Sequence, residues 1–177
     1  MGMKLSWRHG LSRFLREAHR VAVVGVGNPI RGDDAAGTYT AELLRTLSRR
    51  NPHGCGEAHG SLLCIPAGAV PENYLWPVIR FRPSHVVVVD AFDAGLEPGA
   101  VSIIPRSSMD GLSLSSHQLP LGLVRDFLSL NGVPNQLYIG IQPASTGPGT
   151  PMSSRVKASS RKVARTIARL ARQNLNR

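Results

Sequence analysis

Short apolar runs alternate with longer amphipathic segments along this chain. The apolar runs predict buried strands at 20–27, 61–66, 85–90, 100–105 and 136–142. Apolar residues at helical spacing predict helices at 9–19, 34–49, 71–80, 118–130 and 152–174. Strands that alternate with helices are typical of an α/β fold. The pattern therefore predicts a three-layer α/β/α sandwich around a twisted, mostly parallel sheet of about five strands.

Length and composition favour a single domain over residues 1–177. The chain has 177 residues, of which 42% are hydrophobic, and this is long enough to bury a core. The helix at 9–19 would lead into the first strand, and the helix at 152–174 would close the domain. No apolar run approaches the roughly 20 residues that span a bilayer, and the N-terminus lacks the apolar core of a signal peptide. A cytoplasmic location is the default expectation.

Positive charge is concentrated near the C-terminus. The net charge is +10, and the last acidic residue is Asp126. Apolar residues at helical spacing in 152–174 predict a helix with one core face and one basic face. A solvated surface explains such a face in most proteins; a site for an acidic partner protein or a nucleic acid is the functional alternative. The cations after Asp126 are Arg155, Lys157, Arg161, Lys162, Arg165, Arg169, Arg172 and Arg177.

Two cysteines, Cys55 and Cys64, are too few for a disulfide framework and do not form a Cys-x-x-Cys pair. With His53 and His59 they make a loose cluster that could bind zinc. The spacing fits no common zinc motif, and Cys64 lies inside an apolar run. A loop leading into a strand is the better interpretation of this segment.

The first strand runs into a glycine-rich turn that ends in two carboxylates. The segment reads Val21-Ala-Val-Val-Gly25-Val-Gly27-Asn28-Pro29-Ile-Arg-Gly32-Asp33-Asp34. It is not a dinucleotide fingerprint, because Ile30 stands at the third glycine position, and it lacks the ending of a phosphate loop. Asp33 and Asp34 would repel a phosphate at a helix N-terminus. One of them is expected to cap the helix, and the other is a candidate for chemistry on a cation or a peptide.

Two further polar residues are predicted to join this turn. Asp90 ends the four-valine strand 85–90, so Asp34 and Asp90 are expected to approach each other across neighbouring strand ends. His117 stands in a polar run just before the helix at 118–130 and can fold over the same edge. Two carboxylates and an imidazole suit a borderline metal such as nickel or zinc, or acid–base chemistry. An ordinary helix-start residue is the alternative role for His117.

At these residues the chain resembles the [NiFe]-hydrogenase maturation endopeptidases, over roughly residues 20–170. In detail it is most similar to the subgroup that serves formate-hydrogenlyase-type and related energy-converting hydrogenases. The shared motifs are Gly25-x-Gly27-Asn28-Pro29-x-x-Gly32-Asp33-Asp34, Ile65-Pro-Ala-Gly-Ala-Val-Pro-Glu-Asn73, Val89-Asp90-Ala91-x-Asp93-x-Gly95, Leu96-Glu-Pro-Gly99, the Ser-rich lead-in to His117, and Gly140-Ile-Gln-Pro143.

The resemblance implies an α/β/α endopeptidase that removes a short C-terminal extension from a hydrogenase large-subunit precursor after nickel insertion. Asp34, Asp90 and His117 match the family's metal-contacting positions. The nickel is understood to belong to the substrate, so neither a resident ion nor an organic cofactor is implied. Asp93 is then expected to orient a loop or a ligand, and Asp33 to cap the helix.

Two alternatives from other classes remain. Peptidyl-tRNA hydrolases also follow an apolar strand with a Gly-x-Gly-Asn-Pro turn, and a basic surface would suit tRNA. Here the turn continues Ile30-Arg-Gly-Asp-Asp34 instead of the Arg-His-Asn run that supplies catalytic groups in that family. The second alternative is a non-enzymatic basic module that binds nucleic acid or supports hydrogenase assembly. It leaves Asp34, Asp90 and His117 without a role.

Overall fold

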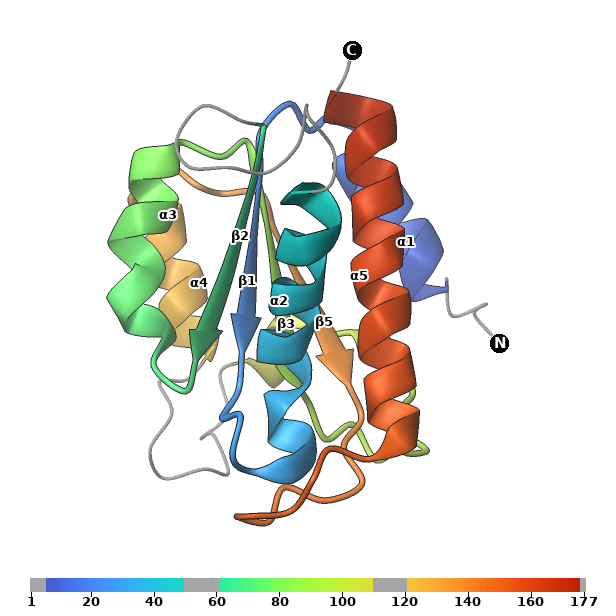
Figure 1. Ribbon diagram of the computed structural model, residues 1–177. Helices are drawn as coiled ribbons and strands as arrows, with labels where there is room; N and C mark the ends of the chain where they lie inside the picture. The colour runs from blue at the N-terminus through green and yellow to red at the C-terminus, as the bar shows by residue number, and fades with distance from the viewer. Residues whose placement is uncertain (1–5, 50–60, 110–120, 176–177) are drawn as a thin grey trace.

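A computed structural model of the protein describes residues 6–49, 61–109 and 121–175 (Figure 1). Its 5-stranded sheet has the order β2-β1-β3-β5-β4. Strands β1 (Val21–Val26), β2 (Leu62–Gly68), β3 (His85–Ala91) and β5 (Gln136–Ile141) pair in parallel. The short edge strand β4 (Val101–Ile103) is antiparallel to β5. The predicted mostly parallel sheet is confirmed.

The helices follow the predicted order, and two of them begin with a 3₁₀ turn. Helix α1 (Trp7–Phe14) ends in η1 (Leu15–Glu17), so the predicted helix 9–19 starts earlier and tightens at its end. The segment η2 (Gly32–Ala35) precedes α2 (Ala36–Arg49), and η3 (Pro71–Tyr74) precedes α3 (Leu75–Phe81). After η4 (Arg106–Ser108) come α4 (Leu121–Leu130) and α5 (Ser154–Leu175). The predicted start of the helix 118–130 lies outside the described residues.

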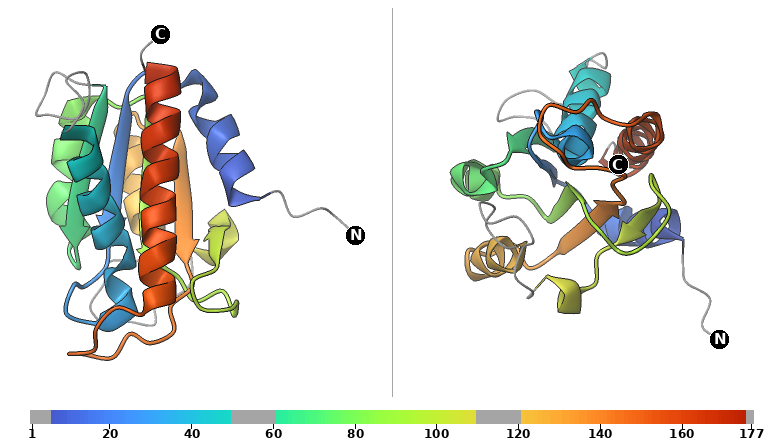
Figure 2. Two further views of the ribbon diagram at one scale, coloured as in Figure 1. Left: turned by 45° about the vertical axis from the view of Figure 1, so that its right-hand side comes forward. Right: turned by 90° about the horizontal axis from the view of Figure 1, so that it is seen from below.

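Helices cover both faces of the sheet, which confirms the three-layer sandwich (Figure 2). Alternate side chains of β3 enter two separate cores. Val87 and Val89 pack with α1, α2 and α5. Val86 and Val88 pack with α3 and α4. This alternation is the two-residue period of a strand, and it explains why an all-valine run can stabilise both layers.

Glycines let α2 pack directly against the sheet. A Cβ on Gly25 would lie 2.1 Å from the carbonyl oxygen of Gly37, and a Cβ on Gly37 would lie 2.0 Å from that of Val89. Both distances are far below van der Waals contact, so only glycine fits at either position. The close approach brings the start of α2 over the carboxyl ends of β1 and β3.

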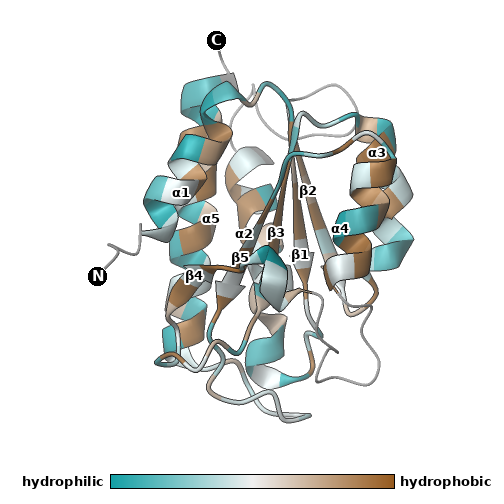
Figure 3. Ribbon diagram, turned by 180° about the vertical axis from the view of Figure 1, so that it is seen from behind, coloured by the Kyte–Doolittle hydropathy of each residue, from teal (hydrophilic) through white to brown (hydrophobic). Residues whose placement is uncertain are grey.

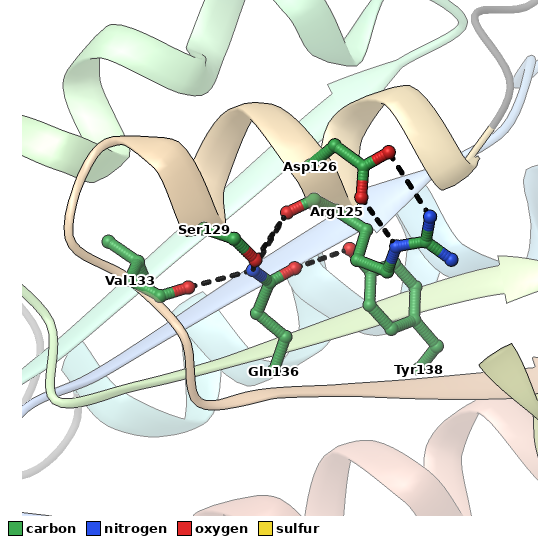
Figure 4. Close-up of polar contacts among 6 residues, drawn as sticks. All are labelled: Arg125, Asp126, Ser129, Val133, Gln136 and Tyr138. Atoms are coloured by element: carbon green, nitrogen blue, oxygen red, sulfur yellow. Dashed lines mark hydrogen bonds and ion pairs between the residues drawn. The ribbon is translucent and has the colours of Figure 1, made fainter.

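A polar network fastens α4 to the sheet (Figure 4). Gln136 of β5 donates through its side-chain amide to the carbonyl oxygens of Arg125 and Val133 and to the hydroxyl of Ser129. The phenol of Tyr138 donates to the Gln136 amide oxygen at 2.7 Å. Desolvation raises the pKa of this phenol, which therefore stays a neutral donor. The network fixes the helix that follows the segment containing His117.

Brown, apolar sides of the helices face the sheet and teal sides face outward (Figure 3). Among the described residues, no helix combines the length and the apolar character that a membrane span requires.

Candidate active site

The carboxyl ends of β1 and β3 lie side by side at one edge of the sheet, the lower edge in Figure 1. In the register of these strands Gly25 is paired with Val89. The turn that follows β1 and the residue that follows Val89 therefore meet at this edge. Ligands of open α/β sheets bind at such carboxyl edges.

The β1–α2 turn holds Asp34 in a fixed position. Gly27 has a φ of +125°, and a Cβ there would lie 1.7 Å from the carbonyl oxygen of Asp34, so the turn requires glycine. The backbone N–H of Asn28 donates to Oδ2 of Asp34 at 2.7 Å. The hydroxyl of Thr38 donates to the carbonyl oxygen of Gly27 at 2.8 Å and ties the turn to α2. Asp34 as a residue is half-buried.

Asp90 is a buried carboxylate beside Asp34. Only 8% of the residue is exposed. Desolvation is the largest influence on its pKa, the negative charge of Asp34 acts in the same direction, and together they raise the pKa of Asp90 to about 7. The N–H of Ala91, which donates to Oδ1 at 2.8 Å, opposes this shift in part. Two carboxylates in this arrangement favour a proton or a cation between them.

Asp33 has a different role from the helix cap that the sequence predicted. It is 1% exposed. Its carboxylate accepts hydrogen bonds from the N–H of Ala144 at 2.8 Å, the N–H of Ser145 at 3.3 Å, and the N–H and hydroxyl of Ser153 at 2.6 and 3.0 Å. The first turn of η2 has no side-chain cap. Asp33 therefore fastens the loop 144–153, and with it the start of α5, to the β1–α2 turn.

Gln142, which sequence reasoning did not single out as a functional residue, organises the loop after β3. It is buried at the end of β5, and its amide oxygen accepts from the N–H groups of Ala94 and Leu96 at 2.8 and 3.0 Å. Its amide nitrogen donates to Asp93 Oδ1 at 3.0 Å. Hydrogen bonds from Gln142 and from the Gly95 N–H lower the pKa of Asp93. Asp93 thus orients the loop. The only signal for Gln142 was its place in the motif Gly140-Ile-Gln-Pro143.

The third predicted member of the set, His117, lies outside the described residues. Its approach to Asp34 and Asp90 stays a prediction. Within the described ranges, no group of three or more His, Cys, Asp and Glu side chains is arranged to hold a metal ion. The zinc alternative also stays untested, because His53, Cys55 and His59 fall outside those ranges, whereas Cys64 is buried in β2 within the core.

Known proteins of similar sequence and fold include several hydrogenase maturation proteases. A sequence model of the family described as hydrogenase maturation protease matches residues 36–170. Hydrogenase 3 maturation protease of Escherichia coli K12 is 32% identical over 133 residues, which cover 75% of this chain and 78% of the relative. The chain belongs to the hydrogenase maturation protease family.

Solved structures agree with this assignment. The crystal structure of a [NiFe] hydrogenase maturation protease HycI from Thermococcus kodakarensis KOD1 has a TM-score of 0.78 and 31% identity, and the match covers 95% of this chain and 99% of that one. The hydrogenase maturating endopeptidase HybD from Escherichia coli, at 21% identity and a TM-score of 0.68, shares the fold over 87% of this chain and 93% of its own. The protease assignment decides against the peptidyl-tRNA hydrolase and non-enzymatic alternatives.

Three large apolar side chains are exposed at the same edge of the sheet as the acidic pair of this maturation protease. Ile30, Val70 and Leu96 are all exposed, and they stand in the loops that follow β1, β2 and β3. Since these strands are neighbours in the sheet, the three side chains rim the same edge as Asp34 and Asp90. Exposed apolar residues that gather at one place mark contact surfaces.

Replacing Asp33 by asparagine is expected to lower the free energy of unfolding of the protease by about 2 kcal/mol. Asparagine replaces one carboxylate oxygen with an NH₂ group, which donates hydrogen bonds and cannot accept them. Some of the buried donors of Ala144 and Ser153 therefore lose their acceptor. Urea denaturation measures the change. The exposed Asp126→Asn is the matched control, because it makes the same chemical change at a surface ion pair with Arg125. Equal, small effects of both substitutions would show that Asp33 does not hold the loop.

Proposed function

We propose that this protease removes the C-terminal extension of a [NiFe]-hydrogenase large-subunit precursor after nickel has been inserted. The observation that carries the proposal is the pairing of Asp34 with Asp90 at the carboxyl edge of β1 and β3, where the charge of one raises the pKa of the other. The relatives named for [NiFe] hydrogenase and for hydrogenase 3 support the choice of substrate class.

The two carboxylates, with His117, would recognise the nickel of the substrate. Carboxylate oxygen and imidazole nitrogen are suitable ligands for a borderline divalent metal. A cation between Asp34 and Asp90 removes the electrostatic repulsion between the two carboxylates. A nickel-loaded precursor brings such a cation, whereas a nickel-free precursor leaves the repulsion in place. Because a cation lowers the pKa of a nearby carboxyl group, binding of the loaded precursor at neutral pH releases the proton held by Asp90. Nickel thus acts as part of the substrate, and no organic cofactor is required.

Hydrolysis in this arrangement needs no nucleophilic side chain. A water molecule adds to the scissile carbonyl carbon, the carbon–nitrogen bond breaks, and the departing amine takes a proton. The substrate's nickel polarises the carbonyl or the water, and a carboxylate of the acidic pair accepts the proton from water. The rim of Ile30, Val70 and Leu96 supplies apolar contacts to the precursor around the cut.

Intact-mass spectrometry of a purified precursor tests the proposal directly. Nickel-loaded precursor incubated with the protease is expected to lose the mass of its C-terminal extension. Nickel-free precursor is expected to be cut at least about a hundredfold more slowly, because its binding leaves the carboxylate repulsion in place. Cleavage of both forms at one rate would refute nickel recognition. A folded, loaded precursor that keeps its full mass would refute the assigned cleavage.

A further inference from the structure

A groove of about 570 Å³ lies between α1 and α5. Both helices pack into the same core on one side of the sheet (Figure 2), and much of their ribbon carries the teal of hydrophilic residues (Figure 3). Five of the side chains that line the groove are cations, and none is acidic or aromatic. The lining residues are Arg8, Ala158, Arg161, Lys162, Arg165, Thr166 and Arg169.

Among the described residues, two other arginines form ion pairs with carboxylates, whereas the groove cations do not. Arg125 meets Asp126 at 2.8 Å and Arg155 approaches Glu97 at 3.9 Å. Within the described ranges, no ion pair involves any of the five groove cations. Neither α1 nor α5 contains an Asp or Glu. The groove therefore concentrates positive charge and attracts anions.

The cations are regularly spaced along α5. Arg161, Arg165 and Arg169 recur every four residues, so they share one face of the helix and stand about 6 Å apart along its axis. Like charges at this spacing repel each other, and the folded chain keeps them together. Alternate side chains of an extended peptide are separated by about 6.7 Å and point to the same side. Acidic residues at every second position of such a peptide match the cation spacing.

The groove is connected to the candidate active site through α5. Asp33, the neighbour of Asp34, holds Ser153 at the start of this helix. Arg161 lies seven residues beyond Ser154, which is about 10 Å along the axis. A folded substrate whose end lies at the acidic pair can thus extend along α5 into the groove.

We infer that the groove between α1 and α5 docks an acidic segment of the hydrogenase precursor, apart from the segment that is cut. The inference rests on the proposed function for the identity of the partner. A protein segment fits better than single-stranded nucleic acid, because no aromatic side chain lines the groove for bases to stack on. Docking at a second surface raises the rate of encounter and favours the correct precursor over other proteins.

A labelled peptide of twelve glutamates serves as the probe, with binding followed by fluorescence anisotropy at about 50 mM salt, where charge interactions are weakly screened. The intact protease is expected to bind it. The triple variant Arg161→Glu, Arg165→Glu, Arg169→Glu is expected to bind at least about tenfold more weakly. The matched control is Arg45→Glu, Arg80→Glu, Arg106→Glu, which changes the net charge equally at sites outside the groove. It is expected to keep most of the binding.

The outcomes separate specific docking from general attraction. Equal loss of binding in both triple variants would overturn the inference, because net charge alone would explain it. A duplex DNA that binds the groove more tightly than the peptide, and loses binding in the groove variant, would also overturn it in favour of nucleic acid. The neutral variant Arg161→Gln, Arg165→Gln, Arg169→Gln keeps the test valid if the reversed charges disturb folding.

Cleavage kinetics connect the groove to the precursor. The groove variant is expected to raise KM for the nickel-loaded precursor about tenfold with kcat unchanged, since the groove is separate from the acidic pair. An unchanged KM would overturn the inference and leave the proposed function intact. Groove-specific peptide binding by a protein that cuts no precursor would instead refute the proposed function while the groove keeps its preference for acidic peptide.

Discussion

Replacing Asp34 or Asp90 by asparagine is expected to slow cleavage of the nickel-loaded precursor at least about a thousandfold. Asparagine keeps the size of the side chain and one oxygen, so the N–H of Asn28 can still donate to residue 34 and that of Ala91 to residue 90. The change removes one negative charge from the pair that is proposed to bind nickel. The loss should therefore come from the site and not from the fold. Intact-mass time courses measure the rate, and circular dichroism checks folding.

The matched control for these substitutions is Glu97→Gln. Glu97 is an exposed carboxylate in the loop after β3, near the same edge of the sheet. Its neutralisation removes the same charge without touching the acidic pair, and near-normal cleavage is expected. Folded Asp34→Asn and Asp90→Asn variants that cut at the rate of the intact protease would refute the proposed roles of both carboxylates.

A second comparison distinguishes nickel recognition from simple acid–base catalysis. If the pair discriminates by charge, the residual cleavage by Asp34→Asn should depend much less on whether the precursor carries nickel. His117→Ala extends the test to the residue outside the described ranges. The same loss of rate and of nickel dependence would place the imidazole in the nickel-binding set, whereas a normal rate would remove His117 from it.

The meeting of Asp34 and Asp90 was predictable because local sequence marks the end of each strand and the turn after β1. Parallel strands end at one edge, the valine run before Asp90 is apolar throughout, and the glycines of the turn after β1 set the approach of the following helix. In each case the residues that determine the position of a carboxylate stand within a few residues of it. The three layers follow from the same alternation of short and long periods, whereas the order of the strands was not predicted.

The roles of Asp33 and Gln142 could not be found in this way. Asp33 binds residues 111 to 120 positions further along the chain, and no short-range pattern marks such partners. Its position before a helix predicted a cap, yet burial beneath the loop 144–153 made backbone donors of that loop the available partners. Gln142 likewise acts on residues 46 to 49 positions earlier. Contacts of this kind depend on how loops fold over the sheet edge.

The raised pKa of Asp90 predicts an unusual dependence of stability on pH. The ordinary pKa of the group is 3.8 and the folded value is about 7, so between these values the folded state binds more protons than the unfolded state. The free energy of unfolding must then fall as pH rises through this window. Each pKa unit corresponds to about 1.4 kcal/mol. The total loss of unfolding free energy is therefore of the order of 4 kcal/mol, and it is complete above about pH 7.

Asp90→Asn is therefore expected to stabilise the protease at pH 8, by as much as a few kcal/mol, although it slows cleavage at least about a thousandfold. Urea denaturation between about pH 4 and pH 8 measures the effect as a flatter profile in the variant. Asp126→Asn is a control that is expected to change the unfolding free energy at pH 8 in the opposite direction. Its ion pair with Arg125 lowers the pKa of Asp126, so that carboxylate contributes stability above its unfolded pKa and loses it as pH falls.

The influence of Asp34 on Asp90 gives the same argument a site-specific test. Asp34→Asn removes the negative charge but leaves Asp90 desolvated, so the pKa of Asp90 should fall only part of the way toward its ordinary value. Carboxyl carbon chemical shifts followed by NMR through the titration report this directly. An unchanged pKa of Asp90 in this variant would show that the charge of Asp34 does not influence Asp90. A partial fall, together with a more stable and inactive Asp90→Asn, would show that the fold tolerates a destabilising charge pair because a cationic substrate neutralises it.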